Sequence, residues 1–389
     1  MNNILLMNKI AKIGTDRLER ELYTCGADVE SPVGIMVRSA KLHDMTFNPE
    51  LLAIARAGAG VNNIPVARCA EEGIVVFNTP GANANGVKEL AICAMLLASR
   101  DIIGGVNWAR SLAGTADVAK QVEAGKAKFA GSELRGKTLG VIGLGAIGGL
   151  VANAAVKLGM TVVGCDPYLS VAGAWNLDHH IVKAATYEEV YAAADYITLH
   201  VPATEKTTGM INAQTIASMK KGVKIINLAR AELVNAADLA VALESGAVSA
   251  YVTDFPTEET VAMPQVVVIP HLGGSTEEAE ENCALMAADE LDEYIRYGNI
   301  QNSVNYPAAT LPVSAASRVC VLHANVPAVL ANISSVMAKD GINIENLLNK
   351  SKGENAYTIL EVNDPVTEKV ERDIAALEGV RRVRTIRFS

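Results

Sequence analysis

The chain has 389 residues, half of them hydrophobic but only 4% aromatic, and its 43 acidic and 34 basic side chains give a formal charge of −9. This composition excludes disordered, collagen-like and disulfide-stapled chains, and the negative charge argues against a nucleic-acid surface covering the whole protein. At roughly 150 residues per domain, two to three domains are expected.

Compartment and partners follow from the cysteines and the apolar stretches. The six cysteines are scattered, with no CxxC and no histidine at metal-ligand spacing, so free thiols and no metal are expected. The N-terminal apolar stretch is too short for a secretory signal, and the most apolar window, residues 90–99, is about half a membrane span. We expect a cytoplasmic protein that binds neither nucleic acid nor membrane.

The elements fall into three parts along the chain. Short β-type runs such as GIMVRSA and GIVVFNTP alternate with helical stretches in the first ninety residues. Six near-continuous apolar runs, from TLGVIGLG to VVVIPHLGG, then predict a parallel sheet covered by helices on both faces. A helical pattern over residues 277–298 leads into a Pro- and Ser-containing linker, and the order βαββαβ after it predicts a small ferredoxin-like α+β unit.

A glycine-rich turn follows the first of those apolar runs and opens an Ala-rich helix. Gly143 permits a tight turn, Gly145 lets the backbone approach a pyrophosphate, and Gly148 allows close helix–strand packing. The pyrophosphate would lie at the helix N-terminus, beside Ala146 and Ile147. Asp166 ends the next strand, where a carboxylate can bind the ribose hydroxyls and repel a 2′-phosphate, so the predicted cofactor is NAD.

Polar side chains end three later strands, at the edge where open α/β sheets hold their ligands. Oxidation of a secondary alcohol needs a base, and His271 suits that task near neutral pH. Glu258 is the candidate carboxylate partner of the imidazole, with Asp254 as the alternative, and Arg230 could bind a substrate carboxylate. Each of these residues also has a non-catalytic explanation. His271 could be structural, Arg230 could form a surface ion pair, and Glu258 could be a solvated loop residue.

Taken together, these segments resemble the D-isomer-specific 2-hydroxyacid dehydrogenases. The resemblance covers nearly the whole chain and rests on ARAGAGVNNI, FNTPGANANGVKEL, GKTLGVIGLGAIG, INLARAELVN, DFPTE and PHLGGST. It is closest to the members that oxidise 3-phosphoglycerate with NAD, the first step of serine synthesis, and that carry a C-terminal ACT domain. It implies a homodimer or homotetramer. Two alternatives stay open: another 2-hydroxy acid as substrate, or a nucleotide-sensing interaction protein on the same scaffold.

The resemblance implies a Rossmann-type doubly wound cofactor domain inserted in a second α/β domain. The expected ranges are a split substrate domain (1–97 and 283–302), an NAD domain (98–282), a linker (303–317) and an ACT domain (318–389). It assigns roles to residues in four groups: catalytic, Arg230, Glu258 and His271; cofactor-binding, Gly143, Gly145, Ala146, Ile147, Gly148, Asp166, Ala229 and Asp254; substrate-binding, Arg38, Ser39, Arg56 and Asn83; and L-serine-binding, His323, Asn325 and Asn343.

The chain also departs from the family pattern. Gly86-Val87-Lys88-Glu89 stands where Ser-Val-Ala-Glu is common, and Arg230-Ala231 replaces Arg-Gly. The segment before DFPTE is one residue shorter than in many members. Which glutamate is the partner of His271, Glu258 or Glu259, therefore stays open. Ala328 replaces a glycine of serine-binding members, and serine regulation is one of two outcomes we expect, an oligomerising module being the other. The four arginines of residues 381–387 are expected to form a solvated strand face, or else a basic partner surface.

Overall fold

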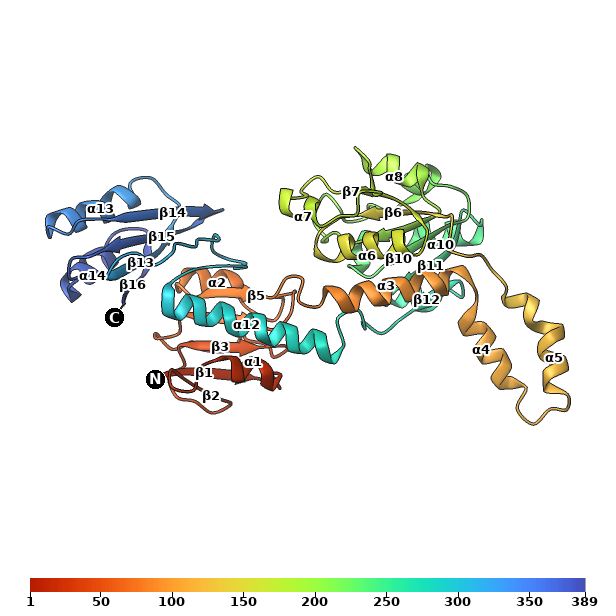
Figure 1. Ribbon diagram of the computed structural model, residues 1–389, viewed down its shortest axis with the longest axis horizontal. Coiled ribbons are helices and arrows are strands. Elements are labelled where there is room, and N and C mark those ends of the chain that lie inside the picture. The colour runs from red at the N-terminus through yellow and green to blue at the C-terminus, as the bar shows by residue number, and fades with distance from the viewer. Residues whose placement is uncertain (389) are drawn as a thin grey trace. The chain divides into compact units, whose positions relative to one another are not determined.

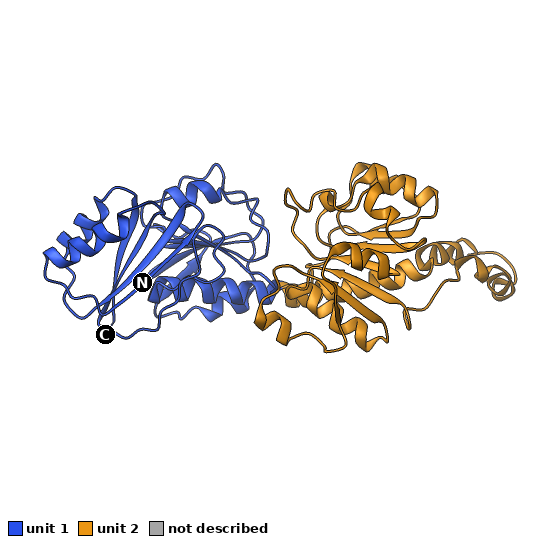
Figure 2. Cartoon of the chain, turned by 90° about the horizontal axis from the view of Figure 1, so that it is seen from above, with its two compact units in different colours: residues 1–82, 280–389 blue, residues 83–279 orange. Residues whose placement is uncertain are grey.

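The computed structural model describes residues 1–388 and divides into two compact units. Unit 1 comprises Met1–Ala82 and Glu280–Ser389, and unit 2 comprises Asn83–Ala279 (Figure 2). The chain therefore leaves unit 1 once, builds unit 2 from one continuous segment, and returns. This is the inserted arrangement that the sequence predicted, although the units group the ACT segment with the first residues of the chain.

Unit 1 contains a five-stranded parallel sheet in the order β2-β1-β3-β4-β5 (Figure 1). Its strands are short and apolar, and β3 and β4 are almost wholly buried, as expected for a parallel sheet covered on both faces. The elements are β1 (Asn2–Met7), α1 (Lys12–Arg17), β2 (Tyr23–Gly26), β3 (Gly34–Val37), β4 (Ala53–Arg56), α2 (Val66–Glu71), β5 (Val75–Asn78) and α12 (Glu277–Tyr297).

Unit 2 is built around a seven-stranded parallel sheet in the order β12-β11-β10-β9-β6-β7-β8. Its strands are β6 (Thr138–Ile142), β7 (Thr161–Cys165), β8 (Val182–Lys183), β9 (Tyr196–Leu199), β10 (Val223–Asn227), β11 (Val248–Thr253) and β12 (Val266–Val268). The chain runs outward from β6 to β8 and then returns to place β9 on the other side of β6. This reversal creates the topological switch point at which doubly wound sheets bind ligands.

The helices of unit 2 connect and cover this sheet. They are α3 (Ala84–Ser99), α4 (Ile102–Ser111), α5 (Val118–Gly125), η1 (Lys126–Phe129), α6 (Ala146–Lys157), α7 (Val171–Trp175), α8 (Tyr187–Ala193), α9 (Ala213–Ala217), η2 (Ala231–Leu233), α10 (Ala236–Glu244) and α11 (Glu258–Val261). The buried face of α3, with Ala91 and Met95 fully covered, belongs to the core cluster of β6 and α6. That packing groups α3 with unit 2, although the expected domain boundary falls near its C-terminus.

The ACT segment forms a four-stranded antiparallel sheet in the order β14-β15-β13-β16. Its elements are β13 (Ser317–Ala324), α13 (Val329–Lys339), β14 (Asn346–Lys352), β15 (Asn355–Val362), α14 (Glu368–Ala375) and β16 (Val380–Arg387). The predicted βαββαβ order is confirmed. The helices cover one sheet face with their own core, which includes Ile333, Met337, Val370 and Ile374.

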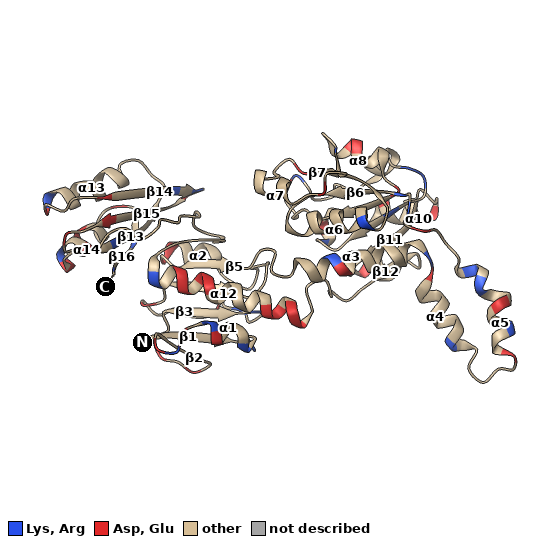
Figure 3. Cartoon of the chain, viewed as in Figure 1, with Lys and Arg blue, Asp and Glu red and all other residues tan. Residues whose placement is uncertain are grey.

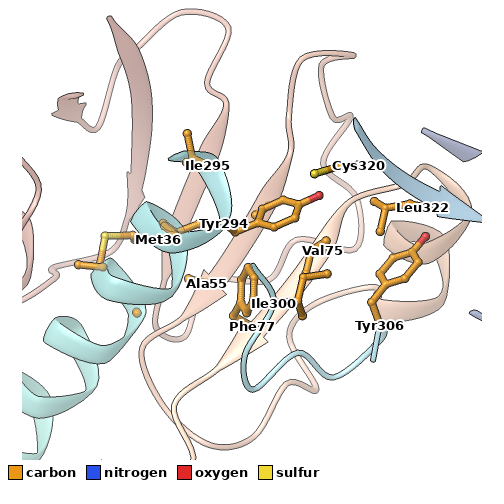
Figure 4. Packing of buried hydrophobic residues seen from close by; sticks show 14 of the residues in the cluster. Met36, Ala55, Val75, Phe77, Tyr294, Ile295, Ile300, Tyr306, Cys320 and Leu322 are labelled. Atoms are coloured by element: carbon orange, nitrogen blue, oxygen red, sulfur yellow. The ribbon is translucent and has the colours of Figure 1, made fainter. Parts of the chain in front are cut away.

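The other face of the ACT sheet packs against the first sheet of unit 1. We call this joint cluster the shared core; it includes Met36, Ala55, Val75, Phe77, Tyr294, Ile295, Ile300, Tyr306, Cys320 and Leu322 (Figure 4). The expected linker contributes buried residues to the shared core instead of being exposed to solvent. Tyr306 is fully buried and its hydroxyl donates to the carbonyl of Ala70, while Asn305 hydrogen-bonds the backbone of β5. The proline- and serine-containing segment is therefore a packed connection.

Three of the four C-terminal arginines do not lie on the solvated face that the sequence suggested, whereas Arg387 is exposed. Arg382 donates to the carbonyls of Leu51 and Glu72, and Arg384 donates to those of Tyr294 and Ile295. Arg381 likewise reaches the carbonyl of Ala70. These carbonyls lie in or next to the last turns of α2 and α12 and just before β4, where a carbonyl oxygen can accept a second hydrogen bond. The expectation was wrong because a strand at the sheet edge faces a neighbouring domain that the local sequence does not reveal.

Candidate active site

The glycine turn lies between β6 and α6. Gly143 has a φ of +89°, and a Cβ there would lie 2.7 Å from the carbonyl oxygen of His200. A Cβ on Gly148 would lie 1.9 Å from the carbonyl oxygen of Gly143, so the helix can approach the turn only without a side chain. At Gly145, by contrast, a Cβ would meet nothing within 4 Å. The backbone is thus open to a ligand at the N-terminus of α6, where unpaired N–H groups favour a pyrophosphate.

Two side chains complete this cofactor edge. Asp166 ends β7, and its carboxylate accepts the N–H groups of Leu144 at 2.9 Å and Tyr168 at 2.8 Å. His200 ends β9 beneath the glycine turn and hydrogen-bonds the hydroxyl of Thr198 at 2.9 Å. Burial lowers the pKa of His200 to about 4, so its imidazole is neutral at pH 7. His200 was not among the residues predicted from the sequence, although it also ends an apolar strand.

Asp254 follows β11 and is 1% exposed. Its Oδ2 accepts the N–H of Gly273 at 2.9 Å, whereas Oδ1 is buried with no partner among residues 1–388. Burial raises the pKa of Asp254, and the Gly273 N–H and the charges of His271 and Arg230 oppose that rise. A buried acceptor without a donor calls for one from a ligand. The carboxamide of a nicotinamide offers such an N–H, so the residues present fit NAD.

Arg230 follows β10 and has an exposed side chain. Its guanidinium donates to the carbonyl oxygen of Ala229 at 2.7 Å and otherwise lies over the ring of Phe255. The backbone beneath it is held by the buried side chain of Asn227, whose Nδ2 donates to the carbonyl of Arg230 and to the hydroxyl of Tyr251. Most of the donors of Arg230 are therefore available for a carboxylate ligand.

His271 follows β12, and its backbone is strained. Its φ is +44°, in the left-handed region that non-glycine residues seldom occupy, and its N–H donates to the carbonyl of Asp254 at 3.0 Å. Outliers of this kind cluster at functional sites. The imidazole is exposed, and no ring nitrogen forms a hydrogen bond or ion pair with another of the described residues. Its one ring contact in the described part of the chain is with Phe255.

The two glutamates of the DFPTE segment begin α11. Side chains at this short helix start form a capping box between Thr257 and Thr260. The pKa of Glu259 is lowered by hydrogen bonds from its own backbone N–H and from Thr257. These bonds hold its carboxylate at the N-terminus of α11. Glu258 is exposed and is not paired with His271 among the described residues. The predicted histidine–carboxylate contact is therefore not formed here, and Phe255 adjoins the imidazole instead.

The residues expected to bind the substrate lie in both units. In unit 1, Arg38 forms an ion pair with Glu280 at 2.5 Å, and Ser39 donates its N–H to Asn8. Arg56 donates to the carbonyl oxygen of Arg38 at 3.1 Å, which holds the two arginines together. Asn83 belongs to unit 2 and is the N-cap of α3, with no side-chain capping bond.

The residues expected to bind serine lie at opposite ends of the ACT sheet. His323 is 3% exposed and lies near the end where Ala324 pairs with Asn355; its ring nitrogens contact Thr358 and the carbonyl of Ala324. Asn325 donates to the carbonyl of Gly353 at that end. The N–H of Asn343 donates to Asp364, just beyond the other end of β15. Strands of this length separate the two ends by on the order of 20 Å, so one chain does not bring the three together.

Two further observations concern metals and membranes. Within residues 1–388, the donor atoms of Asp178, His179 and His180 lie close enough to hold a metal ion, on a surface turn outside the motifs above. This cluster was not among the residues predicted from the sequence. No helix in the described part of the chain combines the length and the apolar character that a membrane span requires.

Comparison with known proteins identifies the family. Residues 95–273 match the NAD binding domain of D-isomer specific 2-hydroxyacid dehydrogenases, and residues 319–382 match an AHAS small subunit-like ACT domain. The chain is 30% identical to D-3-phosphoglycerate dehydrogenase of Dictyostelium discoideum, over 86% of this chain and 81% of that one. It belongs to the D-isomer-specific 2-hydroxyacid dehydrogenase family.

Other members of this family extend the comparison. The Bacillus subtilis D-3-phosphoglycerate dehydrogenase is 36% identical over 75% of this chain and 54% of its own length. The chain thus spans about half the length of several of these relatives. The crystal structure of NAD+-bound 3-phosphoglycerate dehydrogenase from Entamoeba histolytica shares 25% identity, with a TM-score of 0.61 over 78% of this chain and 98% of that one. The resemblance, the fold class, the NAD domain and the ACT domain that the sequence predicted are confirmed.

Proposed function

We propose that this dehydrogenase oxidises 3-phospho-D-glycerate to 3-phosphohydroxypyruvate with NAD, the first step of L-serine synthesis. The observation that carries the proposal is the buried Asp254 acceptor with Arg230 and His271 beside it, at the same sheet edge as the glycine turn. The names of the relatives in the preceding comparison favour this substrate over other 2-hydroxy acids.

Each residue of the sheet edge has a defined task in this reaction. Bound NAD would supply the hydride acceptor. Arg230 binds the substrate carboxylate and polarises the developing carbonyl at C2. His271 takes the proton of the C2 hydroxyl group and returns it in the reverse direction. Glu258 would stabilise the resulting imidazolium once the loop that carries it approaches the ring.

Cations of unit 1 would recognise the phosphate. Arg38 and Arg56 are linked through a hydrogen bond and present two positive charges in a protein of net negative charge. Arg38 forms an ion pair with Glu280, so a phosphate must displace the Glu280 carboxylate or bind Arg38 beside it. We infer that recognition rests on these few arginines rather than on the overall charge. Ser39 and Asn83 would supply neutral hydrogen bonds.

L-Serine is the proposed effector of the ACT domain. Because one chain separates His323 and Asn325 from Asn343, a shared site would need two copies of the chain. A homodimer or homotetramer is consistent with this requirement. The exposed apolar side chains of α4, among them Ile102, Ile103 and Val106, support such an association, since this helix buries none of its own residues.

Steady-state kinetics would test the proposal. Purified protein with NAD should turn over 3-phosphoglycerate, while glycerate and lactate at equal concentration should react far more slowly. Robust turnover of an unphosphorylated 2-hydroxy acid alone would refute the substrate and keep the class. NAD binding without turnover of any hydroxy acid, together with capture of a protein partner, would favour the nucleotide-sensing alternative.

A further inference from the structure

We propose that Phe255 is a positioning residue that holds the imidazole of His271 and the guanidinium of Arg230 in place relative to each other. This inference rests on the proposed function, because it concerns how the acid/base and the substrate-binding cation are aligned. Phe255 itself touches neither hydroxyl nor hydride. Phe255 lies within the DFPTE motif, but neither the motif nor the family resemblance assigned it a role.

The geometry places one ring against both groups. The centroids of the Phe255 and His271 rings are 4.5 Å apart, with the ring planes inclined by 45°. The guanidinium carbon of Arg230 lies 5.4 Å from the Phe255 centroid. Both distances fall within the ranges in which aromatic pairs and cation–π contacts are attractive.

Within residues 1–388, no other side chain forms a hydrogen bond, ion pair or ring contact with His271 or Arg230, although the charge of Asp254 acts on both. The ring nitrogens of His271 form no hydrogen bond within residues 1–388, although a catalytic imidazole ordinarily needs a partner that fixes its orientation. Among the described residues, the direct contacts of the Arg230 guanidinium are with the carbonyl oxygen of Ala229 and the Phe255 ring. Removing the ring would therefore release both groups at once.

The backbone of Phe255 is fixed, whereas its side chain lies beside a cavity. Its N–H donates to the hydroxyl of Thr253 at 3.1 Å, and the preceding residue is the buried Asp254, so the backbone is fixed. Its side chain also lines a cavity of about 200 Å³ with Tyr251 and Leu239. Because the ring is half-buried beside empty space, a leucine there should be accommodated without unfolding unit 2.

The decisive variants are Phe255→Leu, which removes the ring, and Phe255→Tyr, which keeps it. In Phe255→Leu, kcat should fall about threefold to tenfold, the kinetic equivalent of losing one aromatic contact. The KM for the hydroxy acid should rise because Arg230 is no longer held, while the Kd for NAD should stay unchanged. Phe255→Tyr should restore both kinetic parameters.

A spectroscopic measurement separates positioning from general loss of structure. A ring facing an imidazole shifts the imidazole carbon-bound proton resonances upfield through its ring current. In the full chain, the His271 resonances, assigned by their disappearance in His271→Gln, should move downfield in Phe255→Leu and stay in place in Phe255→Tyr. Phe129→Leu is the matched control, because Phe129 packs on Trp108 elsewhere in unit 2. That control should leave both the resonances and the kinetics unchanged.

Two results would overturn the inference: unchanged His271 resonances in Phe255→Leu, or unchanged kcat and KM in that variant despite a shifted resonance. Failure of the proposed function would look different. Wild-type protein inactive on every 2-hydroxy acid would refute that function, whereas the His271 resonances would still report whether Phe255 holds the ring.

Discussion

The sheet edge of unit 2 and the shared core of unit 1 use arginines in opposite ways. Arg230 is exposed, with most of its donors unused. Arg318 in β13 is fully buried, and it donates to Glu361, Asn299 and the carbonyls of Tyr297 and Leu311. An arginine that must bind a ligand is left incompletely satisfied, whereas one that joins two domains is nearly saturated. Hydrogen-bond saturation therefore distinguishes the two roles better than charge does.

The acidic side chains show the same contrast. Glu361 is fully buried, and although burial raises its pKa, hydrogen bonds from Ser314 and Arg318 outweigh that effect and lower it. Glu290, on the acidic helix α12 (Figure 3), is 6% exposed and has one carboxylate oxygen without a partner among the described residues. Burial without sufficient donors raises the pKa of Glu290 to about 8. Unit 1 thus contains a buried glutamate whose two carboxylate oxygens both accept hydrogen bonds, Glu361, and another with one oxygen unpaired among the described residues, Glu290.

The largest effect should come from the unsaturated edge of unit 2. His271→Ala should lower kcat by about 10² to 10⁴, since the proton of the C2 hydroxyl loses its acceptor. The Kd for NAD should be unchanged, because the glycine turn makes no contact with the imidazole and Asp254 is held by the N–H of Gly273. Stopped-flow turnover and NAD fluorescence titration measure the two quantities. Near-normal turnover would show that His271 is not the acid/base. The sheet edge of unit 2 would then have no demonstrated catalytic role to contrast with the structural contacts of unit 1.

Breaking the saturated pair should cost stability instead of catalysis. Arg318→Ala leaves Glu361 buried without its cation, which we expect to lower the free energy of unfolding by about 3 to 5 kcal/mol. Replacing both residues, as Arg318→Met with Glu361→Leu, should recover most of that loss because no unpaired charge remains. Urea denaturation of the full chain, followed by circular dichroism, compares them. Equal destabilisation in the single and double variants would show that hydrogen bonds to the carbonyls matter more than the ion pair.

How far the sequence predicted these regions depends on how local the cause is. The glycine turn, Asp166 and the strand-ending Arg230 and His271 follow from spacing within short segments, and the structure gathers them as parallel strands require. The C-terminal arginines were misjudged because their partners are carbonyls of residues 51–72 and 294–295, far along the chain. Phe255 was missed for a similar reason, since a single aromatic after an aspartate carries no signal until the neighbouring strand ends are known.

An intermediate effect should appear in the pH dependence of stability. Because the folded-state pKa of Glu290 is raised, folded protein keeps its proton while the unfolded chain ionises from about pH 4.5 upward. Stability is therefore lost as pH rises toward about 8. In Glu290→Gln, this loss should shrink by roughly 3 kcal/mol between about pH 5 and pH 8. Thermal unfolding across that range measures it, with Glu293→Gln, on the same helix and beside the same cavity of about 670 Å³, as control.

Parallel pH dependence in wild type and Glu290→Gln would contradict the assignment. It would mean that Glu290 finds a donor, such as water in the cavity it lines, and that the acidic side chains of unit 1 are more uniformly satisfied than the comparison implies.

The smallest effect concerns α13, on the face of the ACT sheet opposite the shared core. Ala328 is the N-cap of α13 and has a φ of +71°, a left-handed conformation that costs an alanine about 1 kcal/mol relative to glycine. Ala328→Gly should therefore stabilise the protein by roughly 0.5 to 1 kcal/mol. It should also tighten L-serine binding if the methyl group obstructs the effector, which isothermal titration of both proteins would measure. Ala331→Gly, inside the same helix, is the control and should destabilise by a similar amount. A gain in stability without serine binding in either protein would assign this face of the domain to assembly alone.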